Sequence, residues 1–188
     1  MKRTKTILLT ITLLLCFSFT ADAQRRLPGM SGVYAFGGIT NAGLSAWHFG
    51  VGYSRYFRNQ QQFAYEFNYL RMTYQQEGFR IPLEQYTVGA RYFRNFFMDR
   101  TRSFFASANV GILLGYETVN RNSRILPNGA LITNSDAVLW GATLGVRLSY
   151  YYQDHLVVLL GINQRAVGGT TVNNFRTQFY IGLKYVFP

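Results

Sequence analysis

Strict two-residue alternation runs through most of this chain, and it is clearest in residues 175–187. One face of this segment carries apolar or small side chains: Phe175, Thr177, Phe179, Ile181, Leu183, Tyr185 and Phe187. The other face carries Arg176, Gln178, Tyr180, Gly182, Lys184 and Val186. Successive side chains of a β-strand point to opposite faces, so the pattern predicts a strand with one apolar and one polar, cationic face. Such strands are typical of membrane β-barrels, whose outer wall meets lipid while the interior is polar.

Seven more segments alternate in the same way and are separated by turn residues. The predicted strands cover approximately residues 31–39, 47–54, 63–69, 85–92, 106–115, 138–149, 156–165 and 175–187. No segment after Phe19 keeps a 3.6-residue helical period, and no internal repeat or low-complexity tract indicates a second domain. We therefore predict an all-β fold in which residues 24–188 form one eight-stranded antiparallel transmembrane up-and-down β-barrel.

The first 23 residues have the features of an export signal. Lys2, Arg3 and Lys5 precede an apolar stretch from Ile7 to Phe19, and Ala21-Asp22-Ala23 forms a small-x-small cleavage site. The stretch is shorter than the roughly 20 apolar residues that a membrane-spanning helix needs. We predict a signal peptide over residues 1–23.

The single cysteine, Cys16, lies inside the predicted signal peptide. Leu15 precedes it, where a lipoprotein signal requires a small side chain, so lipidation is not favoured. After cleavage behind Ala23 the chain has no thiol. Disulfides, cysteine-based metal sites and cysteine nucleophiles are then excluded.

The charge pattern favours a membrane protein over a nucleic-acid-binding protein. The net charge is +11, yet the arginines are scattered singly among strands and turns. We expect them to pair inside the barrel or to contact acidic lipid and polysaccharide head groups, with no direct nucleic-acid partner. An aromatic content of 17% fits girdles of aromatic side chains at the two membrane interfaces.

Charged residues fall on the predicted inner face of the strands, among recurrent glycines. These residues are Glu66, Arg91, Arg147, Arg165, Arg176 and Lys184. An Arg or Lys facing the bilayer midplane costs about 2 to 4 kcal/mol, so these side chains must point into a polar interior. We predict that Glu66 pairs with one or two of the arginines. The interior is then either a bonded plug, which we favour, or an aqueous conduit for ions or small solutes.

The predicted connections differ in length on the two sides of the barrel. Those after odd strands are residues 40–45, 75–83, 117–136 and 166–174, and those after even strands are residues 58–61, 95–101 and 152–154. Outer-membrane barrels place long loops outside and short turns in the periplasm. The longest loop, Glu117 to Asp136, is either a contact surface or a lid packed through Ile125, Leu126, Leu131 and Ile132.

No enzyme motif is present: the chain has no GxSxG, P-loop, GxGxxG or HExxH sequence. We expect His48 to face the interior and to pair with Glu66 as a polar contact rather than to act as a catalytic base. His155 is expected to be an exposed turn residue. We predict no catalytic residue, no cofactor-binding residue and no metal site.

Five segments resemble the TraO proteins of conjugative transposons. They are AQRRLPGMSG (residues 23–32), RIPLEQYT (80–87), GYETVN (115–120), LPNGA (126–130) and TQF (177–179). The resemblance implies a non-enzymatic component of a conjugal DNA-transfer apparatus in the bacterial outer membrane. Its implied partners are other conjugal transfer proteins, and it implies no catalytic residue or ligand.

Two other functional classes remain open. A small porin-like or adhesin-like barrel without a transfer role is the main alternative, and an outer-membrane lipid-modifying enzyme is a third. Within the resembling segments, Arg25, Arg26 and Pro28-Gly29 form a short lead-in before the first strand. This lead-in either docks a partner or serves as a turn that directs the chain into the barrel.

Overall fold

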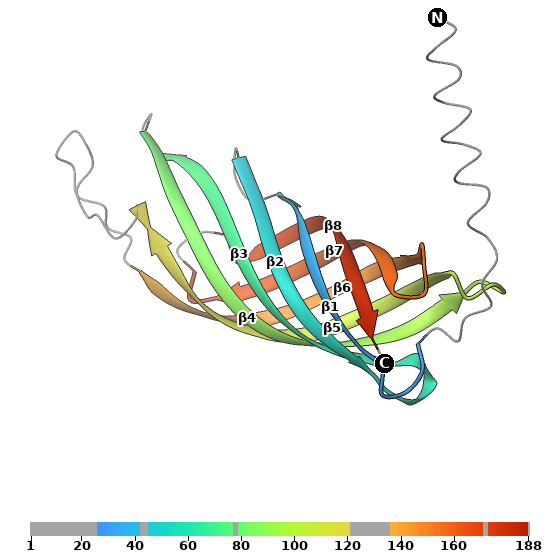
Figure 1. The fold of residues 1–188 in the computed structure, drawn as a ribbon. Helices are drawn as coiled ribbons and strands as arrows, with labels where there is room; N and C mark the ends of the chain where they lie inside the picture. Colours follow the sequence, from blue (N-terminus) through green and yellow to red (C-terminus); the bar gives the residue numbers. More distant parts are fainter. Residues whose placement is uncertain (1–25, 42–44, 77–78, 121–135, 171–172, 188) are drawn as a thin grey trace, which may run out of the picture.

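Eight antiparallel strands close into one barrel in the computed structural model, which describes residues 26–41, 45–76, 79–120, 136–170 and 173–187 (Figure 1). The strands are β1 (Ser31–Thr40), β2 (Ser45–Tyr56), β3 (Gln62–Gln76), β4 (Phe79–Met98), β5 (Phe104–Val119), β6 (Ala137–Tyr151), β7 (Leu156–Gly168) and β8 (Phe175–Phe187), with one 3-10 turn, η1 (Arg58–Gln60). Each strand pairs with its neighbours in the chain, and β8 pairs with β1. The predicted fold class is confirmed. The predicted signal peptide lies outside the described residues.

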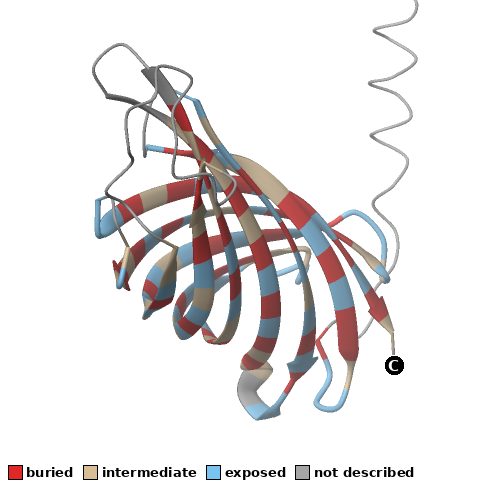
Figure 2. Cartoon of the chain, turned by 90° about the vertical axis from the view of Figure 1, so that its left-hand side faces the viewer, coloured by how far each residue is buried: buried red, intermediate tan, exposed pale blue. Residues whose placement is uncertain are grey.

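The two faces of each strand differ in burial, and Figure 2 shows buried and exposed residues alternating along the strands. In the middle of β5, Ile112 is 68% exposed, whereas the adjacent Leu113 is 5% exposed. The outward side chains over the middle of the barrel are mainly Val, Leu, Ile, Phe, Tyr and Trp. An apolar outer wall of this kind matches the hydrocarbon core of a bilayer. The predicted inner and outer faces of the strands are confirmed.

Closure depends on the pairing of β1 with β8. The register is continuous from Ser31 opposite Phe187 to Thr40 opposite Gln178. Both edge strands therefore find partners, and closure removes free sheet edges. In lipid this is required, because an unpaired backbone N–H or C=O group has no water to bond. No helix in the described parts of the chain is long and apolar enough to cross a membrane.

β3 and β4 are longer than predicted, and the predicted loop over residues 75–83 is wrong. β3 continues to Gln76 and β4 begins at Phe79. Beyond the membrane-facing region the polarity of the two strand faces reverses. The outward side chains there include Arg71 and Thr73, whereas the inward side chains are apolar. The buried inward side chains of this extension are Leu70, Met72, Ile81, Leu83 and Val119. A sheet that projects into water needs an apolar core and a polar surface, which explains the reversal.

The opposite end of the barrel holds short turns and both ends of the described chain. β8 ends there at Phe187, opposite Ser31 at the start of β1, and the backbone N–H of Gly29 donates to the carbonyl of Tyr56 at 2.9 Å. The predicted turn over residues 95–101 is shorter than expected, since β4 continues to Met98 through a bulge between Asn95 and Phe97. Chain ends and short turns mark the periplasmic end of outer-membrane barrels. We call the two ends periplasmic and outward below.

Candidate functional site

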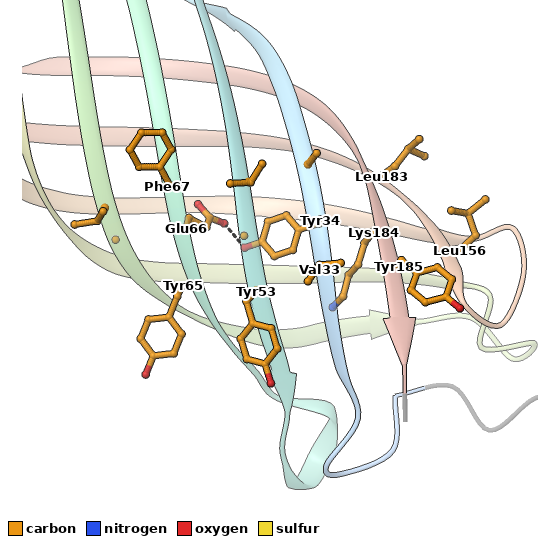
Figure 3. A pocket seen from close by; sticks show the side chains of 15 residues that line it. Val33, Tyr34, Tyr53, Tyr65, Glu66, Phe67, Leu156, Leu183, Lys184 and Tyr185 are labelled. Atoms are coloured by element: carbon orange, nitrogen blue, oxygen red, sulfur yellow. Dashed lines mark hydrogen bonds between the residues drawn. The ribbon is translucent and has the colours of Figure 1, made fainter.

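An ion-pair cluster lies in the middle of the lumen and centres on Glu66. Its two carboxylate oxygens accept contacts from Arg91 Nη2 at 3.0 Å and Arg147 Nη2 at 3.1 Å. The hydroxyl of Tyr34 donates to the same carboxylate at 2.6 Å, as Figure 3 shows. All four side chains are buried. The prediction that Glu66 pairs with one or two arginines is confirmed. We refer to Tyr34, Glu66, Arg91 and Arg147 as the central cluster, which joins β1, β3, β4 and β6.

Two glycines let tyrosines reach this cluster across an intervening strand. Tyr34 on β1 passes over Gly52 on β2, where a Cβ atom would lie 2.4 Å from the ring. Tyr180 on β8 passes over Gly161 on β7, where a Cβ atom would lie 2.3 Å from the ring, and its hydroxyl accepts a hydrogen bond from Arg147 Nε at 2.9 Å. Any side chain at either glycine would displace a tyrosine. The inward glycines therefore provide space for long bonds across the lumen.

His48 faces the lumen as predicted, but its predicted pairing with Glu66 is wrong. Its Nε2 donates to the carbonyl of Phe179 at 3.2 Å, and its Nδ1 accepts a hydrogen bond from Asn68 at 3.4 Å. The strand register explains the difference, because His48 lies opposite Leu70 and Glu66 lies opposite Gly52. His155 is exposed and stacks on Tyr185 at a ring separation of 5.8 Å.

Large side chains fill the lumen, which supports the plug over the conduit. The largest that are almost fully buried include Arg176, Tyr56, Phe93, Phe105 and Lys184. Arg147 stacks on Phe93 with its guanidinium carbon 4.0 Å from the ring centre. A pocket beside Glu66 has a volume of about 10 Å³, which is room for about one water molecule. Side chains can fill an eight-stranded barrel in this way.

A second polar cluster lies at the outward end and joins β4, β5, β8 and the residues that follow β7. Gln85 Nε2 and the hydroxyl of Thr170 both donate to the Glu117 carboxylate, the latter at 2.7 Å. Arg176 donates to Gln85 Oε1 at 2.7 Å and to Thr170 Oγ1 at 2.9 Å. Gln85, Glu117 and Arg176 are each 1% exposed or less. We refer to Gln85, Glu117, Thr170 and Arg176 as the outward cluster.

The base of the longest predicted loop is tied down beside the outward cluster. The hydroxyl of Tyr116 donates to Asp136 at 2.7 Å, and the backbone N–H of Val119 donates to the same carboxylate at 3.3 Å. Residues 121–135, including Ile125, Leu126, Leu131 and Ile132, lie outside the described residues. The structure therefore fixes where the loop starts and ends, and both points lie at the outward end.

At the periplasmic end, Arg26 inserts into the mouth of the barrel. Its guanidinium carbon lies 3.8 Å from the ring centre of Phe105, and its nitrogens donate to Asn95 Oδ1 at 2.7 Å and to the hydroxyl of Tyr151 at 3.2 Å. Only 4% of Arg26 is exposed. Of the two readings of the lead-in, the structure supports the one that directs the chain into the barrel. Gly29 follows with φ +95, in the left-handed region that suits a glycine turn.

Arg26→Ala is expected to reduce the free energy of unfolding by about 2 to 3 kcal/mol, because it removes a desolvated cation–π contact and two hydrogen bonds from a charged donor. Equilibrium urea unfolding of the barrel, followed by tryptophan fluorescence, measures the change. Leu27→Ala is the matched control, since Leu27 is 43% exposed. Equal losses in the two variants would show that the Arg26 contacts contribute nothing to stability.

No group of three or more His, Cys, Asp or Glu residues is placed to hold a metal ion within the described parts of the chain. The chemistry that the lumen offers is ion pairing, hydrogen bonding and cation–π stacking. These interactions position the strands.

The family model described as conjugative transposon protein TraO matches residues 23–187. The chain belongs to the TraO family. The match covers nearly the whole chain and agrees with the resemblance of the five segments. No curated protein matches the chain.

Several solved structures share the fold at low sequence identity. Neisserial surface protein A is 16% identical, with a TM-score of 0.58 over 84% of this chain and 96% of that chain. A major outer membrane protein from Thermus thermophilus is 10% identical, with a TM-score of 0.54 over 86% of this chain and 100% of that chain. Ail, the attachment invasion locus protein of Yersinia pestis, is 13% identical, with a TM-score of 0.53 over the same shares. The chain is thus a TraO-family protein with an outer-membrane barrel fold, and its apolar wall places it in that membrane.

Two of the TraO-like segments pair in the structure, and the residue that precedes a third contacts them. Gln85 of RIPLEQYT is opposite Glu117 of GYETVN in the β4–β5 register. Arg176, which directly precedes TQF, bonds to Gln85. Sequence reasoning identified Arg176 as a lumen cation but missed Gln85 and Thr170 as its partners. The polar inner face of residues 85–91 indicated that Gln85 points into the lumen. Which strand supplies its partner is determined only when the barrel closes.

Proposed function

We propose that the chain is a non-enzymatic outer-membrane subunit of a conjugative transposon mating apparatus. Its barrel anchors it in the membrane, and its outward end contacts other transfer proteins or the recipient envelope. Residues 1–23 direct export and are removed. The observation that carries the proposal is the pairing of two TraO-like segments, bound by Arg176 beside a third, at the outward end of a filled barrel.

The filled lumen supports a role in contacts rather than in transport. Glu66 binds two arginines across the middle of the barrel, and Arg26 blocks the periplasmic mouth. At the outward end, buried bonds hold the strands from which the loop over residues 121–135 departs. Loops on a rigid scaffold commonly carry binding residues. A porin-like conduit is the weaker candidate because ring and guanidinium groups occupy the path.

Deletion of residues 122–134 is expected to leave a folded barrel and to lower mating frequency by at least about tenfold. The anchoring residues Tyr116 and Asp136 remain, so the strands that they join keep their contacts. Donor cells carrying the deletion are compared with wild type in filter matings, and heat-modifiability on gels reports folding in the envelope.

In the matched control, a Gly/Ser linker of equal length replaces residues 122–134. This variant keeps the length of the loop but removes its side chains. Loss of transfer in both variants supports a contact surface made by these residues. Normal transfer in both, with a folded barrel, would contradict the proposal that this loop serves mating. Crosslinking of donor envelopes then identifies the neighbouring proteins.

A further inference from the structure

The described lumen carries more positive than negative charge. Six buried side chains are cationic: Arg26, Arg91, Arg147, Arg165, Arg176 and Lys184. Two buried side chains, Glu66 and Glu117, are carboxylates. Burying a charge in a medium of low dielectric is costly unless a counter-charge lies nearby.

The rest of the sequence offers little further negative charge to the lumen. Among residues outside the described parts, the only acids are Asp22 and Glu77. Asp22 falls in the predicted signal peptide, and Glu77 directly follows the outward end of β3. Glu84 accepts a bond from the exposed Tyr86 on the outer wall. Asp99 and Asp154 belong to periplasmic turns, and Asp136 is bound by Tyr116 and Val119.

Arg165 on β7 is a buried cation that lacks both a carboxylate partner and a full set of hydrogen bonds among the described residues. This residue is 3% exposed and donates from Nη2 to the hydroxyl of Thr87 at 2.9 Å. No carboxylate of the described residues forms a salt bridge with it, and its buried Nε has no hydrogen-bond partner there. Glu66 is already shared by Arg91 and Arg147.

A small pocket adjoins Arg165 on the inner side of the barrel wall. Its polar lining consists of Arg91, Arg165, Thr87, Thr143, Asn68 and Glu66, whose carboxylate is bound by Arg91 and Arg147. The buried hydroxyl of Thr143 also has no partner among the described residues. The pocket has a volume of about 10 Å³, which suits one monatomic ion or one water and excludes larger species.

We propose that this pocket binds one small monovalent inorganic anion, of which chloride is the abundant example. Arg165 Nε and the Thr143 hydroxyl donate to the anion, and the Arg91 guanidinium adds a second positive charge. The anion balances Arg165, which Glu66 does not. A phosphate or sulfate is excluded by size, so the site differs from the anion sites that surface arginines form on lipid head groups.

Bromide replaces chloride and scatters anomalously, which makes it the direct probe. Crystals of the purified barrel grown in sodium bromide are expected to show an anomalous peak between Arg165 and Thr143. Density at this position without anomalous signal, as a water molecule gives, would overturn the proposal.

A solution measurement tests the same site. A ligand that only the folded state binds stabilises that state. At chloride concentrations above the dissociation constant, each tenfold increase is therefore expected to raise the unfolding temperature of the purified barrel by about 3 to 5 °C. The reference is sodium gluconate at equal ionic strength. Arg165→Met is expected to abolish this dependence. Arg100→Met, at an exposed turn position, is expected to retain it. Equal unfolding temperatures of the wild type in chloride and gluconate would overturn the proposal even if Arg165→Met fails to fold.

Discussion

Glu66→Gln is expected to reduce the free energy of unfolding by about 3 to 5 kcal/mol, the typical cost of removing one partner from a buried ion pair. The substitution leaves Arg91 and Arg147 buried without their carboxylate and replaces one of the two acceptor oxygens of Glu66 with an NH2 group, which cannot accept a hydrogen bond. Urea unfolding of the barrel in lipid vesicles measures the loss. Trp47 and Trp140 both lie on the outer wall, so their fluorescence reports transfer from lipid to water.

Glu84→Gln is the matched control for Glu66→Gln. Its carboxylate accepts an exposed hydrogen bond from Tyr86 at 3.2 Å and forms no buried ion pair among the described residues, so a change of less than about 1 kcal/mol is expected. A double variant, Glu66→Gln with Arg147→Met, is expected to lose less than the sum of the two single variants, because both single changes remove the same Glu66–Arg147 ion pair. Additive losses, or equal losses for Glu66→Gln and Glu84→Gln, would contradict the account of the central cluster.

Ile112→Arg is expected to cost about 2 to 4 kcal/mol, the value for an arginine at the bilayer midplane on the lipid face of a barrel. Ile112 lies in the middle of β5 and is 68% exposed. Met98→Arg is the depth control, because Met98 is the last residue of β4, at the periplasmic rim, and is also exposed. There the expected cost falls to about 0 to 1 kcal/mol.

Folding into vesicles under identical urea gradients compares Ile112→Arg with Met98→Arg. A cost that falls with distance from the middle of the barrel places the bilayer midplane near the middle of β5. Equal costs at the two positions would contradict that placement, and a negligible cost at Ile112 would show that this wall does not face lipid.

Much of the fold was predictable from the sequence because one constraint acts on every strand. A lipid-facing wall with a polar interior produces period-two patterns such as Val110, Ile112 and Leu114 opposite Asn109 and Gly111. Even the glycine-rich first strand, predicted over residues 31–39, was placed correctly, and it closes the barrel by pairing with β8. The prediction was wrong over residues 75–83, where the strands leave the membrane. There the alternation of polar and apolar residues continues, but the apolar residues face the lumen. A search for strands whose apolar face meets lipid therefore misses this part of β3 and β4.

The lumen contacts were predictable by residue type but not by partner. Exposing Glu66 or Arg147 to lipid is costly, so both were predicted to face the lumen. Their opposite charges predicted an ion pair. Whether a lumen side chain meets its neighbour or crosses to a distant strand depends on space, which the glycines set. Tyr34 reaches Glu66 because Gly52 has no side chain, and His48 misses Glu66 because their register positions differ. Arg26 was assigned to a lead-in outside the barrel, since nothing in its local sequence indicates that it folds back into the mouth.

The most direct test of the barrel is spin-label accessibility along β5. The chain has one cysteine, Cys16, in the predicted signal peptide, so single cysteines introduced at residues 108–114 can be labelled in the processed protein without background. In vesicles we expect period-two behaviour, with labels at 108, 110, 112 and 114 open to dissolved oxygen from the lipid and labels at 109, 111 and 113 shielded. A 3.6-residue period, or uniform access to a water-soluble relaxation reagent, would contradict the barrel.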